Sequence, residues 1–169
     1  VEMSHLGMVG HRPDVILDKA RSSAVKGIQQ GMNVAQQLNG RTKMAHLDLG
    51  QENFLLVVTY KDLYFGNGNT FHETVAQEKI DEIRSDLQGD PLPLENIYFL
   101  SIDDFDILTQ LIKEKKCTIS EAIEKAKEDD SDPQTSKFLF RQHLVANYGL
   151  VGMPDYLSQE FKGLEQRLR

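Results

Sequence analysis

Phe54-Leu55-Leu56-Val57-Val58 is the stretch of this sequence that decides the fold. Five consecutive apolar residues with a β-branched end are typical of a strand that is buried on both faces. Such a strand needs helices above and below it, so the stretch predicts a central strand in a helix-covered sheet. A second buried strand is predicted at 97–100, where the sequence is Ile-Tyr-Phe-Leu.

The residues before this strand predict one long helix and shorter extended segments. Ile28, Met32 and Ala35 recur at helical spacing, which predicts a helix over about 25–38 that ends at Asn39-Gly40. Further upstream, a loop is expected over 1–12. Short strands are expected at 13–17 and 43–49, the first because proline is tolerated at the start of a strand.

Helices are predicted after both buried strands. Two of these helices are expected to begin with a capping box, formed by Thr70 with Glu73 and by Thr118 with Glu121. A third is expected to begin at an N-cap residue, either Ser101 or Asp103. The acidic run 128–132 is interpreted as a solvated break, and two helices are expected after it, at roughly 135–147 and 154–167. The predicted fold is therefore α/β, with a mixed central β-sheet flanked by helices and extra C-terminal helices. Residues 1–132 would form the α/β domain, and 133–169 a helical extension packed on it.

Composition limits the classes of function. The 169 residues, 40% of them hydrophobic, suit one globular domain. A net charge of -7 argues against a general basic coat for nucleic acid. The single Cys117 excludes an intramolecular disulfide and favours a reducing, cytoplasmic setting, where we expect it to be buried and inert. No apolar run approaches the roughly 18 residues of a membrane span. Because the chain begins at Val1, we expect a fragment or a processed product.

Residues 5–23, HLGMVGHRPDVILDKARSS, contain the residue types of a metal-dependent nuclease site. Asp14 and Asp18 offer the hard oxygen ligands that Mg²⁺ prefers. Lys19 offers a cation that can orient the attacking water or stabilise charge at the scissile phosphate.

These residues belong to an ordered set of motifs along the chain. The set consists of HLG, RPD, a D-K-A-x-S run, an I-x-Q helix and the buried FLLVV strand. Over about residues 5–127 this order resembles the cleavage domain of FokI-type, type IIS restriction endonucleases, a branch of the PD-(D/E)XK nuclease superfamily. The resemblance implies a restriction-endonuclease-like fold and Mg²⁺-dependent hydrolysis of DNA phosphodiester bonds that leaves a 5′-phosphate.

By this resemblance, Asp14 matches the first metal-binding aspartate, Asp18 the second acid and Lys19 the catalytic lysine. The residues expected to contact DNA or to lie at the edge of the site are Ser22, Ser23, Lys26, Gln29 and Gln30. The resemblance also implies double-stranded DNA as substrate and a homodimer formed through the helix at 28–38. A separate recognition domain or subunit is expected, because the sequence has no helix-turn-helix or zinc module.

The spacing of the acids departs from the family. There, one residue separates the second acid from the lysine, and a hairpin separates the two acids. On a continuous strand, Asp14 and Asp18 would lie roughly 13 Å apart, too far to share an ion whose bonds are about 2.1 Å long. Three explanations are open: residues are missing around 17–19, a helical turn at 13–19 brings the acids to about 5–6 Å, or the site is degenerate and inactive.

Two rival functions follow from the same residues. A different PD-(D/E)XK enzyme, such as a DNA repair or junction nuclease, would use the same chemistry on another DNA shape. A non-catalytic interaction module would keep the nuclease fold without its metal site.

Overall fold

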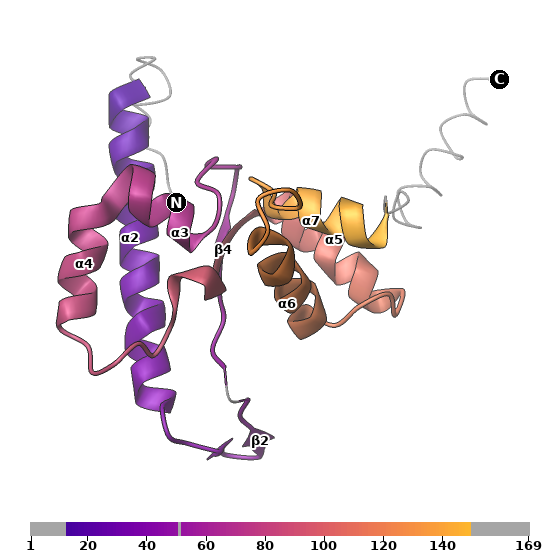
Figure 1. Cartoon of the computed structure of the whole chain (residues 1–169), viewed down its shortest axis with the longest axis horizontal. Coiled ribbons are helices and arrows are strands. Elements are labelled where there is room, and N and C mark those ends of the chain that lie inside the picture. The colour runs from indigo at the N-terminus through magenta and orange to yellow at the C-terminus, as the bar shows by residue number, and fades with distance from the viewer. Residues whose placement is uncertain (1–12, 51, 150–169) are drawn as a thin grey trace, which may run out of the picture.

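A computed structural model describes residues 13–50 and 52–149. A two-stranded parallel sheet separates two groups of helices, each with its own hydrophobic core (Figure 1). The α/β class is thus confirmed, with a smaller sheet than the sequence predicts. The loop expected over 1–12 and the helix expected at 154–167 lie outside the described residues.

Along the chain, one long helix is followed by three strands, and the last strand lies between two series of helices. The helices are α2 (Pro13–Leu38), α3 (Gly68–Phe71), α4 (Gln77–Ser85), α5 (Ile102–Lys113), α6 (Ile119–Asp130) and α7 (Phe140–Tyr148). A π-helical segment, His72–Ala76, joins α3 to α4, and a single 3-10 turn, Leu94–Asn96, precedes the last strand. The strands are β1 (Lys43–Met44), β2 (Leu47–Asp48), β3 (Leu55–Thr59) and β4 (Ile97–Ser101).

Helix α2 corrects the prediction of a strand at 13–17, because one helix runs from Pro13 to Leu38. Its buried side chains recur every three or four residues: Ala20, Ala24, Ile28, Met32 and Ala35. Proline is compatible with a first helical turn, where the N–H groups have no partner within the helix. A short apolar run such as Val15-Ile16-Leu17 does not distinguish a strand from a helix by pattern alone. The helical explanation for 13–19 therefore holds for the backbone.

Strands β3 and β4 form the boundary between the two cores. They pair in parallel, with Leu55 opposite Ile97 and Thr59 opposite Ser101. The alternate residues Leu55, Val57, Ile97 and Phe99 face the core of α2 and α4. Leu56, Tyr98 and Leu100 face the core of α5, α6 and α7. The continuous apolar runs are explained by this burial on two faces.

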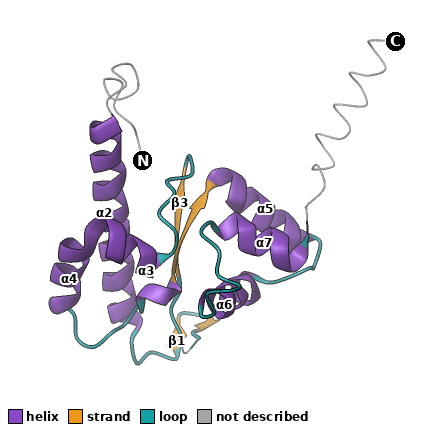
Figure 2. Ribbon diagram, turned by 45° about the horizontal axis from the view of Figure 1, so that its top comes forward, coloured by secondary structure: helices purple, strands orange, loops and turns teal. Residues whose placement is uncertain are grey.

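The position of β3 within the sheet differs from the prediction of a central strand. Among the described residues β3 pairs with β4 alone, and it is partly exposed where β4 is buried throughout. The other edge of β4 carries a bridge between Asn67 and Tyr98. The strand expected at 43–49 is a small antiparallel hairpin of β1 and β2, a sheet of its own (Figure 2). β3 is thus an edge strand in the described structure.

The N-terminal caps of the helices agree with the sequence in two cases and differ in a third. Ser101 and Thr118 begin α5 and α6 with capping boxes, as predicted. The cap of α3 is Asn67, whose side chain accepts a hydrogen bond from the backbone N–H of Thr70 at 3.0 Å, so the predicted start at Thr70 is wrong. The helix predicted at 135–147 begins only at Phe140 and shares its core with α5, α6 and β4.

Replacement by alanine is expected to have different effects on stability at Gly68 and at Gly27. A Cβ at Gly68 would lie 2.2 Å from the Leu94 carbonyl oxygen, a backbone atom that cannot move alone. A Cβ at Gly27 would meet Val57 Cγ1 at 3.7 Å, an ordinary contact. We expect Gly68→Ala to lower the free energy of unfolding by about 1–3 kcal/mol or more. Gly27→Ala should be neutral or raise it by up to about 1 kcal/mol, since alanine favours the helix. Urea unfolding of both variants measures this, and equal effects would contradict the close approach of Gly68 to the backbone of Leu94.

Candidate functional site

The predicted catalytic residues lie at the N-terminal end of α2. Asp14 is the second residue of this helix, and its side chain lies outside the described part of the structure. The side chains of Asp18 and Lys19 are exposed. Positions 14 and 18 are one helical turn apart, about 6 Å along the axis. The backbone therefore brings the two acids closer together than the predicted strand could.

The residues predicted to contact DNA continue along α2. Ser22, Lys26 and Gln29 are exposed at helical spacing from Asp18, so all four share one face of the helix. The Ser22 hydroxyl donates a hydrogen bond to the backbone carbonyl of Asp18, which orients it toward its own helix. The remaining two residues lie elsewhere on α2: Ser23 is half-buried, and Gln30 lines the groove between α2 and β3.

A closed metal cage is not found near these residues. Across the described side chains, no three His, Cys, Asp or Glu residues are grouped closely enough to hold a metal ion. Mg²⁺ in enzymes that act on phosphates commonly uses one or two carboxylates and takes its other ligands from water and substrate. A site of this second kind requires fewer protein ligands than a closed cage, so the grouping of described side chains does not decide whether one exists on α2.

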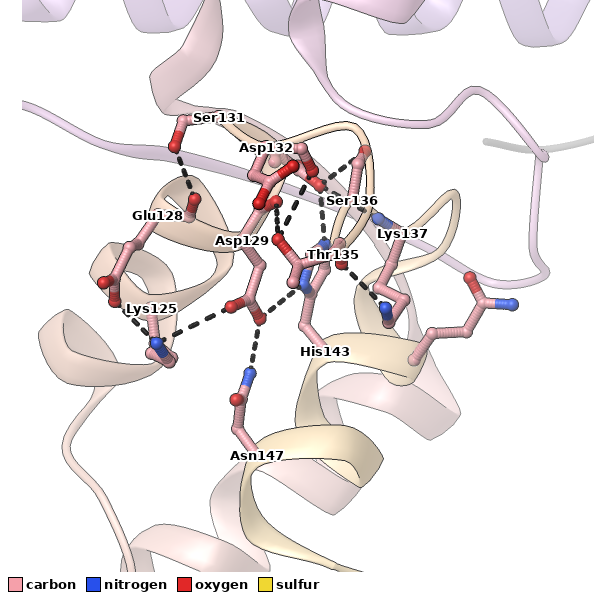
Figure 3. A network of polar contacts seen from close by, with 12 residues as sticks. Lys125, Glu128, Asp129, Ser131, Asp132, Thr135, Ser136, Lys137, His143 and Asn147 are labelled. Atoms are coloured by element: carbon pink, nitrogen blue, oxygen red, sulfur yellow. Dashed lines mark hydrogen bonds and ion pairs between the residues drawn. The ribbon is translucent and has the colours of Figure 1, made fainter.

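The acidic run 128–132 is the place where the sequence interpretation fails most clearly. It predicts solvated carboxylates, whereas the side chains of Asp129 and Asp130 are 12% and 8% exposed. Both contact the buried ring of His143 on α7. Figure 3 shows the contact that Asp129 makes with this ring. The ring Nδ1 lies 3.3 Å from Asp129 Oδ2, and Nε2 lies 3.1 Å from Asp130 Oδ1. A protonated imidazolium satisfies both contacts, because each nitrogen then donates.

Asp130 joins four parts of the fold through its two oxygens. Oδ2 accepts hydrogen bonds from the Asn67 amide at 2.9 Å and from the Tyr98 hydroxyl at 3.3 Å. Oδ1 accepts one from the backbone N–H of Lys137 at 3.1 Å. Burial acts to raise the pKa of Asp130, but hydrogen bonds from His143, Asn67 and Lys137 outweigh it and hold that pKa below its usual value. The carboxylate is therefore stabilised in its charged form by the fold itself.

Asp129 behaves in the same way. Its Oδ2 accepts a hydrogen bond from the Asn147 amide at 2.7 Å. Burial again acts to raise the pKa of Asp129. Hydrogen bonds from Asn147 and His143 and the charge of Lys125 outweigh burial, so this pKa lies below its usual value. Because Asp129 on α6 contacts both His143 and Asn147 on α7, the cluster favours a structural role at the junction of these two helices.

A signal for this cluster was present in the sequence. The buried positions Ala122 and Ala126 recur every four residues along α6, and the next position in that series is Asp130. An acid that continues an apolar stripe faces the core, and a buried acid requires partners.

A second group of charges lies at the carboxyl ends of β3 and β4, where ligands of α/β proteins often bind. Asp104 is buried and forms an ion pair with Arg141, Nε to Oδ1 at 2.5 Å. Burial and the neighbouring charge of Asp104 raise the pKa of Asp62 above its usual value. The cavity beside these residues has a volume of about 10 Å³, which leaves room for little more than one water. This cavity, as the described residues line it, is therefore too small for a substrate.

Cys117 is buried, as predicted. Its burial, and to a lesser extent the nearby charge of Glu121, raise the pKa of its thiol. A raised thiol pKa disfavours the reactive thiolate, so an inert side chain fits the structure.

No family model matches the sequence, and the comparisons with curated proteins and with solved structures give no match. Among the helices within residues 13–50 and 52–149, none is both long enough and apolar enough to cross a membrane. A functional assignment must therefore be argued from the residues themselves.

The acids of the His143 cluster predict a loss of stability at low pH. Folding lowers the pKa values of Asp129 and Asp130 below the unfolded value of 3.8. Their contribution to the free energy of unfolding is therefore complete above pH 3.8, and it is lost as the pH falls through the lower pKa values of the folded state. We expect the free energy of unfolding to fall steeply below about pH 4. In Asp130→Asn that fall should be shallower and the stability at neutral pH lower. Urea unfolding at a series of pH values tests this, with Asp86→Asn, an exposed acid after α4, as the control. An unchanged pH profile in Asp130→Asn would contradict the role of this carboxylate.

Proposed function

We propose that this domain is the DNA-cleavage part of a Mg²⁺-dependent endonuclease of the type II, IIS-like restriction class. The observation that supports the proposal is the continuity of α2 through residues 13–19. In this helix, positions 14 and 18 are one turn apart and position 19 follows directly, and the described side chains of Asp18 and Lys19 are exposed, so that a DNA duplex could approach them.

The carboxylates of Asp14 and Asp18 would hold the ion together with water and a phosphate oxygen of the DNA. When bound there, Mg²⁺ supplies the positive charge that acidifies a water and neutralises the scissile phosphate. Lys19 would stabilise the charge that develops on the phosphate during attack. These three side chains provide the residue types that phosphodiester hydrolysis requires.

Local features of α2 support an approach of DNA despite the acidic chain. The N-terminal end of a helix carries unpaired N–H groups and a positive dipole, which attract a phosphate. The exposed cations Lys19, Arg21 and Lys26 lie on the same part of α2. With a net charge of -7, most of the binding energy would come from a separate recognition domain or subunit.

The proposed homodimer needs a surface other than the core face of α2. Ile28, Met32 and Ala35 are buried against the chain's own core, so they are not available for a partner. Pairing through 28–38 would have to use the exposed residues of that helix.

Another PD-(D/E)XK enzyme, one that acts on repair intermediates or junctions, would use the same three residues. Cleavage of duplex, flap and four-way DNA by the same preparation distinguishes these substrates.

The cleavage proposal predicts that both acids are required. Asp14→Asn and Asp18→Asn should each reduce Mg²⁺-dependent nicking of plasmid DNA by at least about a hundredfold. Both variants should unfold at the same urea concentration as the wild type if the acids act only in cleavage, and the side chain of Asp18 is exposed. Asp103→Asn is the matched control, since Asp103 is an exposed acid in the first turn of α5. Full activity in either α2 variant would exclude the two-acid site.

A non-catalytic interaction module is the second candidate. It is favoured by the edge of β3 that has no strand partner in the described structure. A wild-type chain that neither cuts DNA nor binds Mg²⁺ or Mn²⁺ in a titration would support this function over cleavage.

A further inference from the structure

The free edge of β3 lacks the features that usually protect a strand edge. Natural edge strands commonly carry lysine, proline or a bulge that prevents further pairing. The stretch from Phe54 to Thr59 has no charged residue and no proline, and β3 pairs with β4 residue by residue. Its composition is that of an interior strand, yet one row of its backbone groups has no strand partner in the described structure.

An apolar groove of about 440 Å³ follows this edge. One wall is α2, through Gly27, Gly31 and Val34, and the other contains every residue from Asn53 to Val57. Successive residues of a strand point to opposite faces, so a hollow that contacts five in a row runs along the edge. The groove therefore gives access to the backbone of β3 as well as to its side chains.

The groove is also free of charge. None of the side chains that line it is acidic or basic, although 27% of the chain is charged and its net charge is -7. Two copies of a chain with this net charge repel each other overall. An uncharged face is where two such copies can meet without opposing like charges. Val34 and Val58, 53% and 41% exposed, add apolar surface beside the edge.

We propose that the β3 edge binds a second copy of this chain, with the two β3 strands antiparallel about a twofold axis. The two parallel pairs would then form one mixed sheet in the order β4-β3-β3-β4, with the β3 strands at its centre. The exposed side of α2 near Val34 would contact the partner along the groove.

Symmetry favours a second copy over a foreign strand. A twofold axis joins identical edges, so each copy satisfies the other and neither β3 edge remains open. A foreign strand added to β3 would present a new open edge of its own. The far edge of β4 carries the Asn67 bridge and lies beside α3, so the sheet would not extend there and the assembly would stop at a dimer. The inference does not depend on the cleavage chemistry.

The test is the mass of the full chain in solution, by sedimentation equilibrium over a range of concentrations. We expect a reversible dimer. Val58→Glu and Val58→Lys, each at an exposed position of β3, should raise the dimer dissociation constant at least about tenfold, because each places like charges in the interface. Val34→Glu should do the same from the α2 wall. Ile119→Glu is the matched control at a 45% exposed position on α6, and it should leave the constant unchanged.

Charge complementation makes the test specific. An equimolar mixture of the Val58→Glu and Val58→Lys chains should form a mixed dimer, because opposite charges then meet. Circular dichroism of each variant verifies that the monomer is folded. A wild-type chain that stays monomeric at all concentrations overturns the proposal. So does a dimer that none of the β3 and α2 variants weakens. A dimer that neither binds metal nor cuts DNA would leave the proposal standing while the cleavage function fails.

Discussion

The parallel pairing of β3 with β4 is the interaction on which the rest of this structure depends. Each strand sends alternate side chains into two different cores, so a single pair of strands holds α2 and α4 on one side and α5, α6 and α7 on the other. Parallel strands need cover on both faces, and this requirement explains why helices surround so small a sheet. Gly31 lets α2 lie directly on Leu55, because a Cβ there would be 2.6 Å from the leucine Cδ2. The glycines of α2, which weaken an isolated helix, are thus consistent with close packing on the sheet.

Local patterns in the sequence were sufficient for the elements whose signals are long or chemically specific. The apolar runs predicted β3 and β4, and the Ser101 and Thr118 caps predicted where α5 and α6 begin. The error at 13–17 has a local cause, since three apolar residues fit either period. The error over the position of β3 has a different cause. The residues of a strand indicate whether both of its faces are buried. The number of strands that pair with it depends instead on segments far away in the chain.

The candidate site shows the same division. The face shared by Asp18, Ser22 and Lys26 follows from helical spacing once the helix is known. The partners of Asp130 could not be inferred in this way, because Asn67 lies 63 residues before it and His143 reaches it from another helix. A buried carboxylate is costly unless hydrogen bonds replace its water. The sequence could therefore indicate that Asp130 needs partners, but only the fold identifies them.

Helix α2 connects the proposed chemistry to the proposed pairing. Its N-terminal end carries Asp18 and Lys19, and its later residues line the groove beside β3. The rise per residue of a continuous helix is fixed. Asp18 and Gly31 therefore stay roughly 20 Å apart along the axis of α2 whether or not a partner is present. Binding of a second copy at β3 would then leave the geometry of each acidic pair unaltered. What the partner would set is the distance between the two pairs, and with it the offset between cuts in opposite DNA strands. In a dimer of this kind, the sheet edge would govern where the chain cuts, and the end of α2 would govern whether it cuts.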